Sequence, residues 1–272
     1  MQPPWHPDPI ADAADPGLSP AGAPAGVSAI GAVKDVFADP EWKHNVLFAL
    51  IFMIIPIVGP MALSGWMCEV MQRKARRQPQ PIPYLDFGDF GEYIKRGVTV
   101  FLVQLVVTIP LMIVFYGLAA VVAVAVVGVM SATNEPLIGL AVGAVLGFVA
   151  LLVLLAVGVV VNAVHTRAEL TENFSEALRL GEVLAYSKAT FWRVLIKNFA
   201  FMFVATGIII VGLLACYIGL YPAAAVIQIA AMHLRFQVYD DYLARGGPAI
   251  EPKVATALPS EQRAQQYAGY GY

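Results

Sequence analysis

The chain has 272 residues, of which 59% are hydrophobic and 13% are charged, and its formal net charge is -2 at pH 7. Soluble globular proteins carry about 25% charged residues, so this composition excludes an ordinary soluble domain and predicts an integral membrane protein. The slightly negative charge, without a basic stripe, gives no support for nucleic-acid binding. Cys68 and Cys216 lie in separate apolar segments, which indicates neither a disulfide framework nor a metal site.

The two ends of the chain differ in composition from the part between them. Residues 1–31 contain no Lys or Arg and many Pro, Ala and Asp residues, which predicts a disordered N-terminal tail rather than a signal peptide. Residues 246–272 are rich in Gly, Pro, Ala, Gln and Tyr and predict a disordered C-terminal tail. We expect one helical transmembrane domain over residues 32–245.

The first apolar segment covers residues 45–71, after a short stretch whose Trp42 suits the membrane surface. Pro56, Gly59 and Pro60 interrupt its centre, because each proline removes a backbone donor and disfavours helix at the residue before it. Two alternatives remain open: one sharply kinked span, or a re-entrant hairpin of two half-helices. The hairpin is favoured, because the N-terminal tail then stays on one side of the membrane.

A basic cluster and a polar connection follow the first apolar segment. The connection, residues 78–97, begins with alternate prolines, and then Phe87, Phe90 and Ile94 fall at helical spacing. This pattern predicts a surface helix capped by Asp86 or Asp89. The polar residues around this part of the chain are candidate contacts for lipid head groups: Glu69, Arg73, Lys74, Arg76, Arg77, Asp86 and Asp89.

Two long apolar stretches, residues 98–130 and 137–164, are separated by a turn at residues 131–136. Neither contains an Asp, Glu, Lys or Arg. Each exceeds the roughly 20 apolar residues that cross a bilayer, so they predict a transmembrane helical hairpin. As helices they would reach about 50 and 42 Å, which is longer than the hydrocarbon core of about 30 Å.

The last apolar segments complete the predicted topology. After an amphipathic stretch at residues 165–198, we expect spans at residues 199–216 and 223–236. Lys and Arg occur in the connections 72–97 and 165–198 but not in the turns 131–136 and 217–222. The positive-inside rule therefore places the two basic connections and the C-terminus in the cytoplasm. The predicted fold is an all-α polytopic helical membrane protein with four clear transmembrane helices, the broken first segment and amphipathic interfacial helices.

Signs of chemistry are weak along the whole sequence. No H-E-x-x-H, phosphate-binding or dinucleotide motif occurs, so we expect no enzyme activity, no catalytic residue, no metal and no cofactor. Ser64 with Gly65 weakly resembles the nucleophile loop of rhomboid proteases, but Ala62 replaces the first glycine, and a bond from Ser64 to its own helix is the better interpretation. Glu69 and His233 are the titratable residues in apolar segments that a coupled transporter could use.

Small residues recur on the long hairpin. Gly139, Gly143 and Gly147 repeat every four residues, and Ala119 and Ala123 give a weaker version on the other arm. Such faces let helix backbones approach closely, either between the two arms of one subunit or between subunits. The excess length of the arms favours the second alternative, because the uncovered apolar surface needs lipid or neighbouring subunits.

The function expected from these patterns is a non-enzymatic, homo-oligomeric, ring-like or otherwise multimeric membrane assembly. It would enclose or organise lipid or a pore, with membrane lipids and further copies of the chain as its partners. The alternative is a small-molecule or ion transporter or channel that uses the broken first segment at Pro56, Gly59 and Pro60.

Two short motifs carry a resemblance to a known family. The first is Gly65-Trp66-Met67-Cys68-Glu69-Val70, and the second is Pro83-Tyr84-Leu85-Asp86-Phe87-Gly88-Asp89-Phe90, which precedes Arg96-Gly97. On these motifs, residues from about 42 to 240 resemble a family of uncharacterised multi-pass membrane proteins of bacteria and archaea that carry a domain of unknown function. The resemblance implies one membrane domain in a bacterial cytoplasmic (inner) membrane, and it implies no activity.

Overall fold

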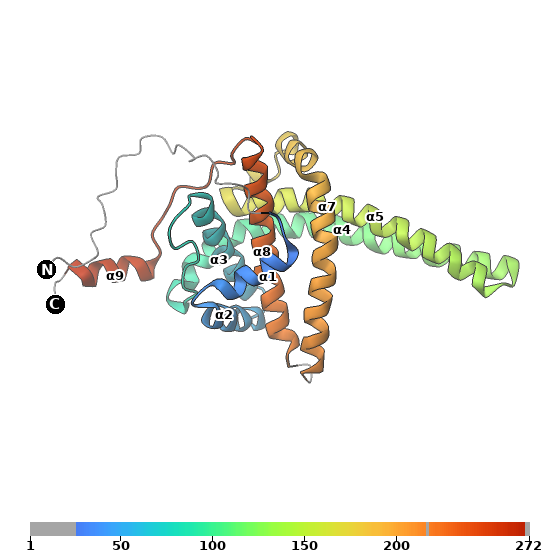
Figure 1. The fold of residues 1–272 in the computed structure, drawn as a ribbon, viewed down its shortest axis with the longest axis horizontal. Helices are drawn as coiled ribbons and strands as arrows, with labels where there is room; N and C mark the ends of the chain where they lie inside the picture. Colours follow the sequence, from blue (N-terminus) through green and yellow to red (C-terminus); the bar gives the residue numbers. More distant parts are fainter. Residues whose placement is uncertain (1–25, 216–217, 270–272) are drawn as a thin grey trace.

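The computed structural model describes residues 26–215 and 218–269, and this part of the chain is built of helices without any strand (Figure 1). The predicted all-α class is therefore confirmed. The helices are α1 (Ala29–Ala38), α2 (Trp42–Ile54), α3 (Val58–Ala75), the 3-10 helix η1 (Phe87–Asp89), α4 (Phe90–Thr133), α5 (Pro136–Thr171), the short α6 (Phe174–Ala177), α7 (Leu180–Leu214), α8 (Leu220–Ala244) and α9 (Pro259–Gly269).

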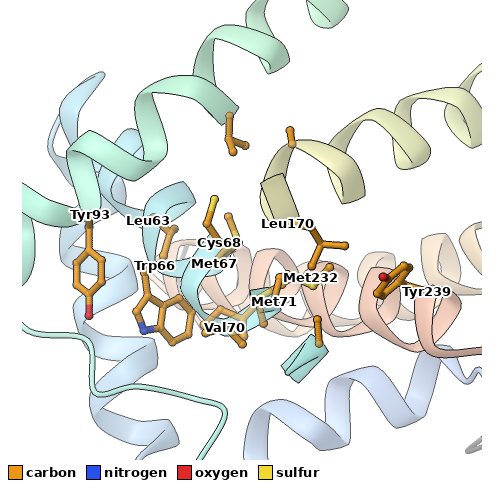
Figure 2. Close-up of a cluster of buried hydrophobic side chains, with 14 of the residues drawn as sticks. Leu63, Trp66, Met67, Cys68, Val70, Met71, Tyr93, Leu170, Met232 and Tyr239 are labelled. Carbon is orange, nitrogen blue, oxygen red and sulfur yellow. The ribbon is translucent and has the colours of Figure 1, made fainter. Parts of the chain in front are cut away.

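Helix α3 lies at the centre of the helical body. Every residue from Ala62 to Arg73 is buried, and α3 contacts α2, α4, α5 and α8. Figure 2 shows its side chains beside Tyr93 of α4, Leu170 of α5, and Met232 and Tyr239 of α8. A helix that is buried on all sides must be surrounded by other helices, so α3 is the element around which the body packs.

The broken first segment folds back on itself as the α2–α3 hairpin. The turn is tight, because the Val58 amide donates to Pro56 O at 2.6 Å and Ile57 has a φ of 62°. Gly59 lies against the carbonyl oxygen of Phe52, where a side chain would overlap the backbone of α2. Further from the turn, Asn45 of α2 and Trp66 of α3 bond the same loop, through Leu85 N (2.9 Å) and Pro83 O (3.0 Å). Of the two alternatives, the structure therefore has the hairpin geometry.

Helices α4 and α5 form a long antiparallel hairpin that projects from the body (Figure 1). The turn is favoured by its sequence: Asn134 has a left-handed φ of 54° after α4, and Pro136 begins α5. No residue of α4 after Val103 is buried, and in α5 only Gly139 is buried before Val159. The projecting part is thus an apolar hairpin whose outer surface is not covered by the rest of the chain.

Helices α7 and α8 form a second antiparallel pair, which crosses the α4–α5 hairpin in Figure 1. The pair is closest near its turn, where a Cβ on Gly212 would lie 2.7 Å from Gly219 O. Helix α1 packs against α7 and α8 through Ala29, Ala32 and Val36.

Three helices of the described residues are long and apolar enough to cross a membrane: Phe87–Thr133, Pro136–Thr171 and Leu180–Leu214. They correspond to three of the four predicted spans and support membrane association. The fourth predicted span, residues 223–236, lies in α8, which has 25 residues and is long enough to cross a membrane but is not apolar enough. Gln228, His233 and Arg235 lower its mean hydropathy, and many of its apolar residues pack inside the body.

Helices occur within both of the predicted tails. Helix α1 already begins inside the predicted tail 1–31, while residues 1–25 and Cys216 lie outside the described residues. Residues 250–261 pack against the body: Ile250 and Leu258 are buried, and Tyr239 Oη accepts a hydrogen bond from Ile250 N at 2.9 Å. A few anchoring contacts order this segment although its overall composition is typical of a disordered tail.

The crossing of α3 and α4 gives a prediction for Gly65. A Cβ at this position would overlap the carbonyl oxygen of Tyr93, so Gly65→Ala must push the two backbones apart. We expect a loss of about 1–3 kcal/mol in the free energy of unfolding, measured by thermal or denaturant unfolding in detergent. The matched control is Gly91→Ala on α4, where a Cβ meets open space. This control should be neutral or slightly stabilising. Equal effects of the two substitutions would contradict the close crossing.

Candidate functional site: a buried ion network beside a polar cavity

Glu69 is a carboxylate inside the apolar core, with 4% of its surface exposed. Its Oε1 accepts from Arg73 Nε at 2.5 Å, one helical turn further along α3. Its Oε2 forms an ion pair with Arg96 Nη1 of α4. A buried carboxylate is costly unless cations and hydrogen bonds compensate it, and here two guanidinium groups do so. Glu69 therefore joins α3 to α4 through charge as well as through packing.

The network continues to the end of α5. Arg96 Nη1 lies 3.7 Å from Oε1 of Glu172, the residue that follows α5 in a left-handed conformation with a φ of 47°. Gln72 Nε2 donates to the same Oε1 at 2.8 Å, and Lys253 Nζ lies 2.6 Å from Glu172 Oε2. Alternating charges thus connect α3, α4, α5 and the segment after α8.

The C-terminal segment, residues 253–261, covers the ion network and adds further bonds to it. Glu261 pairs with Arg73 at 2.6 Å, and the carbonyl oxygen of Thr256 accepts from Arg96 Nη2 at 3.0 Å. Ser260 donates to Asp89 twice, from its amide at 2.8 Å and from its hydroxyl at 2.5 Å. These bonds hold residues 253–261 across the ends of α3, η1 and α4.

A cavity of about 760 Å³ lies beside this network, a size typical of small-molecule sites. The end of α3, the α1–α2 turn, the loop 79–84, His233 of α8 and the C-terminal segment form its walls. Lys74 Nζ lies 2.7 Å from His233 Nδ1, and because an ammonium only donates, Nδ1 is the acceptor. Burial lowers the pKa of Lys74, while the carboxylates of Asp35 and Asp240 oppose this shift. The arrangement can bind a polar ligand.

The comparisons with known proteins give one match. A family model described as "Protein of unknown function (DUF4013)" matches residues 48–231, about two thirds of the chain. The chain belongs to this family. The match lies within the residues on which the sequence resembles an uncharacterised family, so that prediction is confirmed. No curated protein and no solved structure matches the chain.

The predicted head-group residues of this DUF4013 domain are partly brought together. Glu69, Arg73 and Lys74 meet at the network and the cavity. Each of the others has a partner elsewhere in the chain: Arg76 bonds Gln72 and Lys253 O, Arg77 pairs with Asp240, Asp86 caps η1 by accepting from Gly88 N, and Asp89 accepts from Ser260. Most of the basic cluster is therefore used inside the protein rather than left on an open surface.

Several residues of the site carry no signal in the sequence. Arg96, Glu172, Lys253 and Glu261 are each polar residues in polar connections or in the predicted tail. Their partners lie 27 to 188 positions away, so spacing cannot reveal them. His233 stood out only as a titratable residue in an apolar segment. In the described part of the chain, no group of three or more His, Cys, Asp or Glu residues could hold a metal ion.

The small residues of the long hairpin divide into two sets. Added Cβ atoms on Gly139 and Gly143 would meet Met130 and Val126 of α4, at 2.8 Å from the Val126 side chain in the case of Gly143. These two glycines thus pack the arms of one subunit. A Cβ on Gly147 meets open space, and Ala119 and Ala123 are exposed instead of facing the glycines. Of these small residues, only Gly147, Ala119 and Ala123 are open to contact with a neighbouring helix.

The broken-helix residues have structural roles in the DUF4013 domain. Pro56, Gly59 and Pro60 surround the α2–α3 turn, where Gly59 permits the close approach to Phe52. Ser64 Oγ donates to Pro60 O at 2.8 Å, so its hydroxyl is bonded to its own helix.

The Glu69 network predicts the effect of removing its charge. Glu69→Gln leaves Arg96, whose side chain is 2% exposed, without its closest carboxylate. We expect a loss of about 3–5 kcal/mol in the free energy of unfolding, measured by denaturant unfolding in detergent. The control is Lys95→Met, which breaks an exposed pair with Glu92 and should cost less than about 1 kcal/mol. A loss for Glu69→Gln no larger than the control would show that the network does not hold the helices.

The C-terminal segment gives a prediction about local opening. Leu258 is 1% exposed, so Leu258→Ala removes a buried anchor and should free residues 250–262 from the body. We expect amide hydrogen exchange in this segment to rise at least tenfold while exchange in α3 changes little. Val254→Ala, at a position 84% exposed, is the control and should leave exchange unchanged. Fast exchange of the segment in the wild-type protein would contradict the docked arrangement.

Proposed function

We propose that this chain is a non-enzymatic protein of the bacterial cytoplasmic membrane whose copies assemble through their α4–α5 hairpins. The assembly, ring-like or otherwise multimeric, would enclose or organise lipid or a pore. The observation that carries the proposal is the projecting apolar hairpin, most of whose surface lies outside the body. An exposed apolar surface of this extent needs lipid or protein to cover it.

The length of the hairpin favours neighbouring subunits in addition to lipid. Residues 104–133 of α4, none of them buried, would extend about 45 Å, against a hydrocarbon core of about 30 Å. Tilt absorbs part of the difference. Exposed small residues at Ala119, Ala123 and Gly147 would let a second helix approach closely.

The distribution of charge supports the proposed orientation. The basic residues after α3 and those of residues 165–198 lie in the body, and the hairpin turn at residues 131–136 has none. We therefore place these basic connections and the C-terminus on the cytoplasmic side and the turn at residues 131–136 outside. Helix α2, at 13 residues, extends about 20 Å and cannot cross the bilayer alone, which favours a re-entrant α2–α3 hairpin.

The alternative function, transport through the broken first segment, has less support. A transporter site needs a polar group that can exchange partners with an ion or substrate. The Glu69 carboxylate is instead held by both Arg73 and Arg96. The α2–α3 turn is tightly closed by Gly59 and Phe52. The lipid-organising assembly therefore remains the function that the geometry supports best.

The proposed assembly predicts the effect of enlarging the exposed hairpin face. Gly147→Leu and Ala123→Leu should lower the subunit number, because each adds bulk where a neighbouring helix would pack. The measurement is native mass spectrometry from lipid nanodiscs, with helix content checked by circular dichroism. We expect at least a tenfold loss of assembled particles.

The matched control is Gly207→Leu on α7, which adds the same side chain at another glycine with open space around it. It should keep the wild-type subunit number. A monomeric wild-type protein, or unchanged assembly in both hairpin variants, would contradict the proposal.

A further inference from the structure

The cavity at the end of α3 has charges of both signs on its walls. Arg73 and Lys74 line it from α3, while Asp35, Asp39 and Glu41 line it from α1 and the α1–α2 turn. A site with this lining suits a ligand that itself carries a positive and a negative group.

Lys74 is the cation that a ligand can use. Arg73 is already neutralised by Glu69 and Glu261, at 2.5 and 2.6 Å. Within the described residues Lys74 has no carboxylate within ion-pair distance, and its one hydrogen bond is to His233 Nδ1. An ammonium has three donors, so two remain for an anion. His233 holds the ammonium in place at the cavity wall, and its own Nε2 has no partner among the described residues.

The opposite wall offers a carboxylate to a positive group. Asp35 and Asp39 each accept a side-chain hydrogen bond, from Gln237 and Asn45. The carboxylate of Glu41 is exposed and makes no hydrogen bond in the part of the chain that the structure describes. Glu41 is thus free to bind an ammonium group at the mouth of the cavity.

The remaining lining is apolar and stiff. Pro79, Pro81 and Pro83 form an extended wall without backbone donors, and Ile82 and Leu258 complete it. Tyr84 is stacked on His44 with ring centroids 3.8 Å apart, which fixes the end of this loop. Such a wall suits the methylene or glycerol part of a ligand rather than a second charge.

We propose that the cavity binds a phosphate ester of an amino alcohol, with its phosphate at Lys74 and its ammonium at Glu41. This is the chemistry of a phosphatidylethanolamine head group and also of free phosphoethanolamine. This site rests on the lipid-organising function proposed above and names the head group that the protein would bind. Binding of the head group does not depend on the number of subunits. The cavity lies beside the basic end of α3, so in the proposed orientation it would lie at the level of the lipid head groups on the cytoplasmic side.

The test is a calorimetric titration of the purified full-length protein in detergent with dihexanoyl-phosphatidylethanolamine. We expect saturable binding that Lys74→Met weakens at least tenfold and Glu41→Gln weakens about threefold to tenfold. Glu41 is exposed, so its variant tests the site even if Lys74→Met destabilises the protein. Lys188→Met and Glu251→Gln are the matched controls, because neither residue makes an ion pair in the described chain. Both should bind like the wild type.

Two further ligands separate the outcomes. Free phosphoethanolamine binding as tightly, with the same variant effects, would support the site and assign it to a soluble compound. Dihexanoyl-phosphatidylglycerol binding equally well, with no effect of Glu41→Gln, would overturn the assignment to an amine-bearing ligand. Absence of saturable binding by a protein with a normal unfolding transition would overturn the site itself. Binding by a monomeric protein would instead contradict only the proposed assembly.

Discussion

The paired burial of Glu69 with Arg73 and Arg96 is the interaction on which the rest of the structure depends. The negative charge of Glu69 lies within the packed part of α3, and it is compensated by Arg73 of the same helix and by Arg96 of α4. Because Arg96 lies just before the apolar part of α4, the pair fixes where the projecting hairpin leaves the body. Glu172 at the end of α5 and Lys253 extend the same network, so both arms of the hairpin are anchored by charge.

This anchoring divides the molecule into two parts with different physical roles. The body is tightly packed: Gly65 and Gly97 bring α3 and α4 into backbone contact, and Leu258 seals the C-terminal segment against it. The part of the hairpin beyond Val103 is packed mainly between its own two arms and is little buried by the rest of the chain. A packed body that anchors a projecting apolar hairpin through buried charges is suited to a membrane protein whose interactions include that hairpin. The cavity at Lys74 lies on the body, where head groups and hydrocarbon meet in the proposed orientation.

Much of the fold follows from local patterns in the sequence. Long apolar runs predict α4, α5 and α7, the polar stretch 131–136 predicts the turn between the arms, and Pro56 with Pro60 predicts the break before α3. The fourth predicted span is not supported, because Gln228, His233 and Arg235 make α8 less apolar than the other three helices, and many of its apolar residues pack inside the body. Ala119 and Ala123 were placed opposite the glycines by spacing, although the register of the arms turns them outward. The ion network and the cavity join residues far apart in the chain, and only the packing of α3 brings them together.

In the proposed assembly, several copies associate through hairpins that cross the bilayer. Imaging of the wild-type protein in lipid nanodiscs by electron cryomicroscopy tests it most directly, because it shows the subunit number and the direction of the hairpin at once. The account predicts two or more copies whose α4–α5 hairpins cross the membrane side by side, with Ala123 and Gly147 facing a neighbour and lipid held between the copies. A single copy whose hairpin is surrounded only by lipid, or a hairpin that lies outside the bilayer, would contradict it.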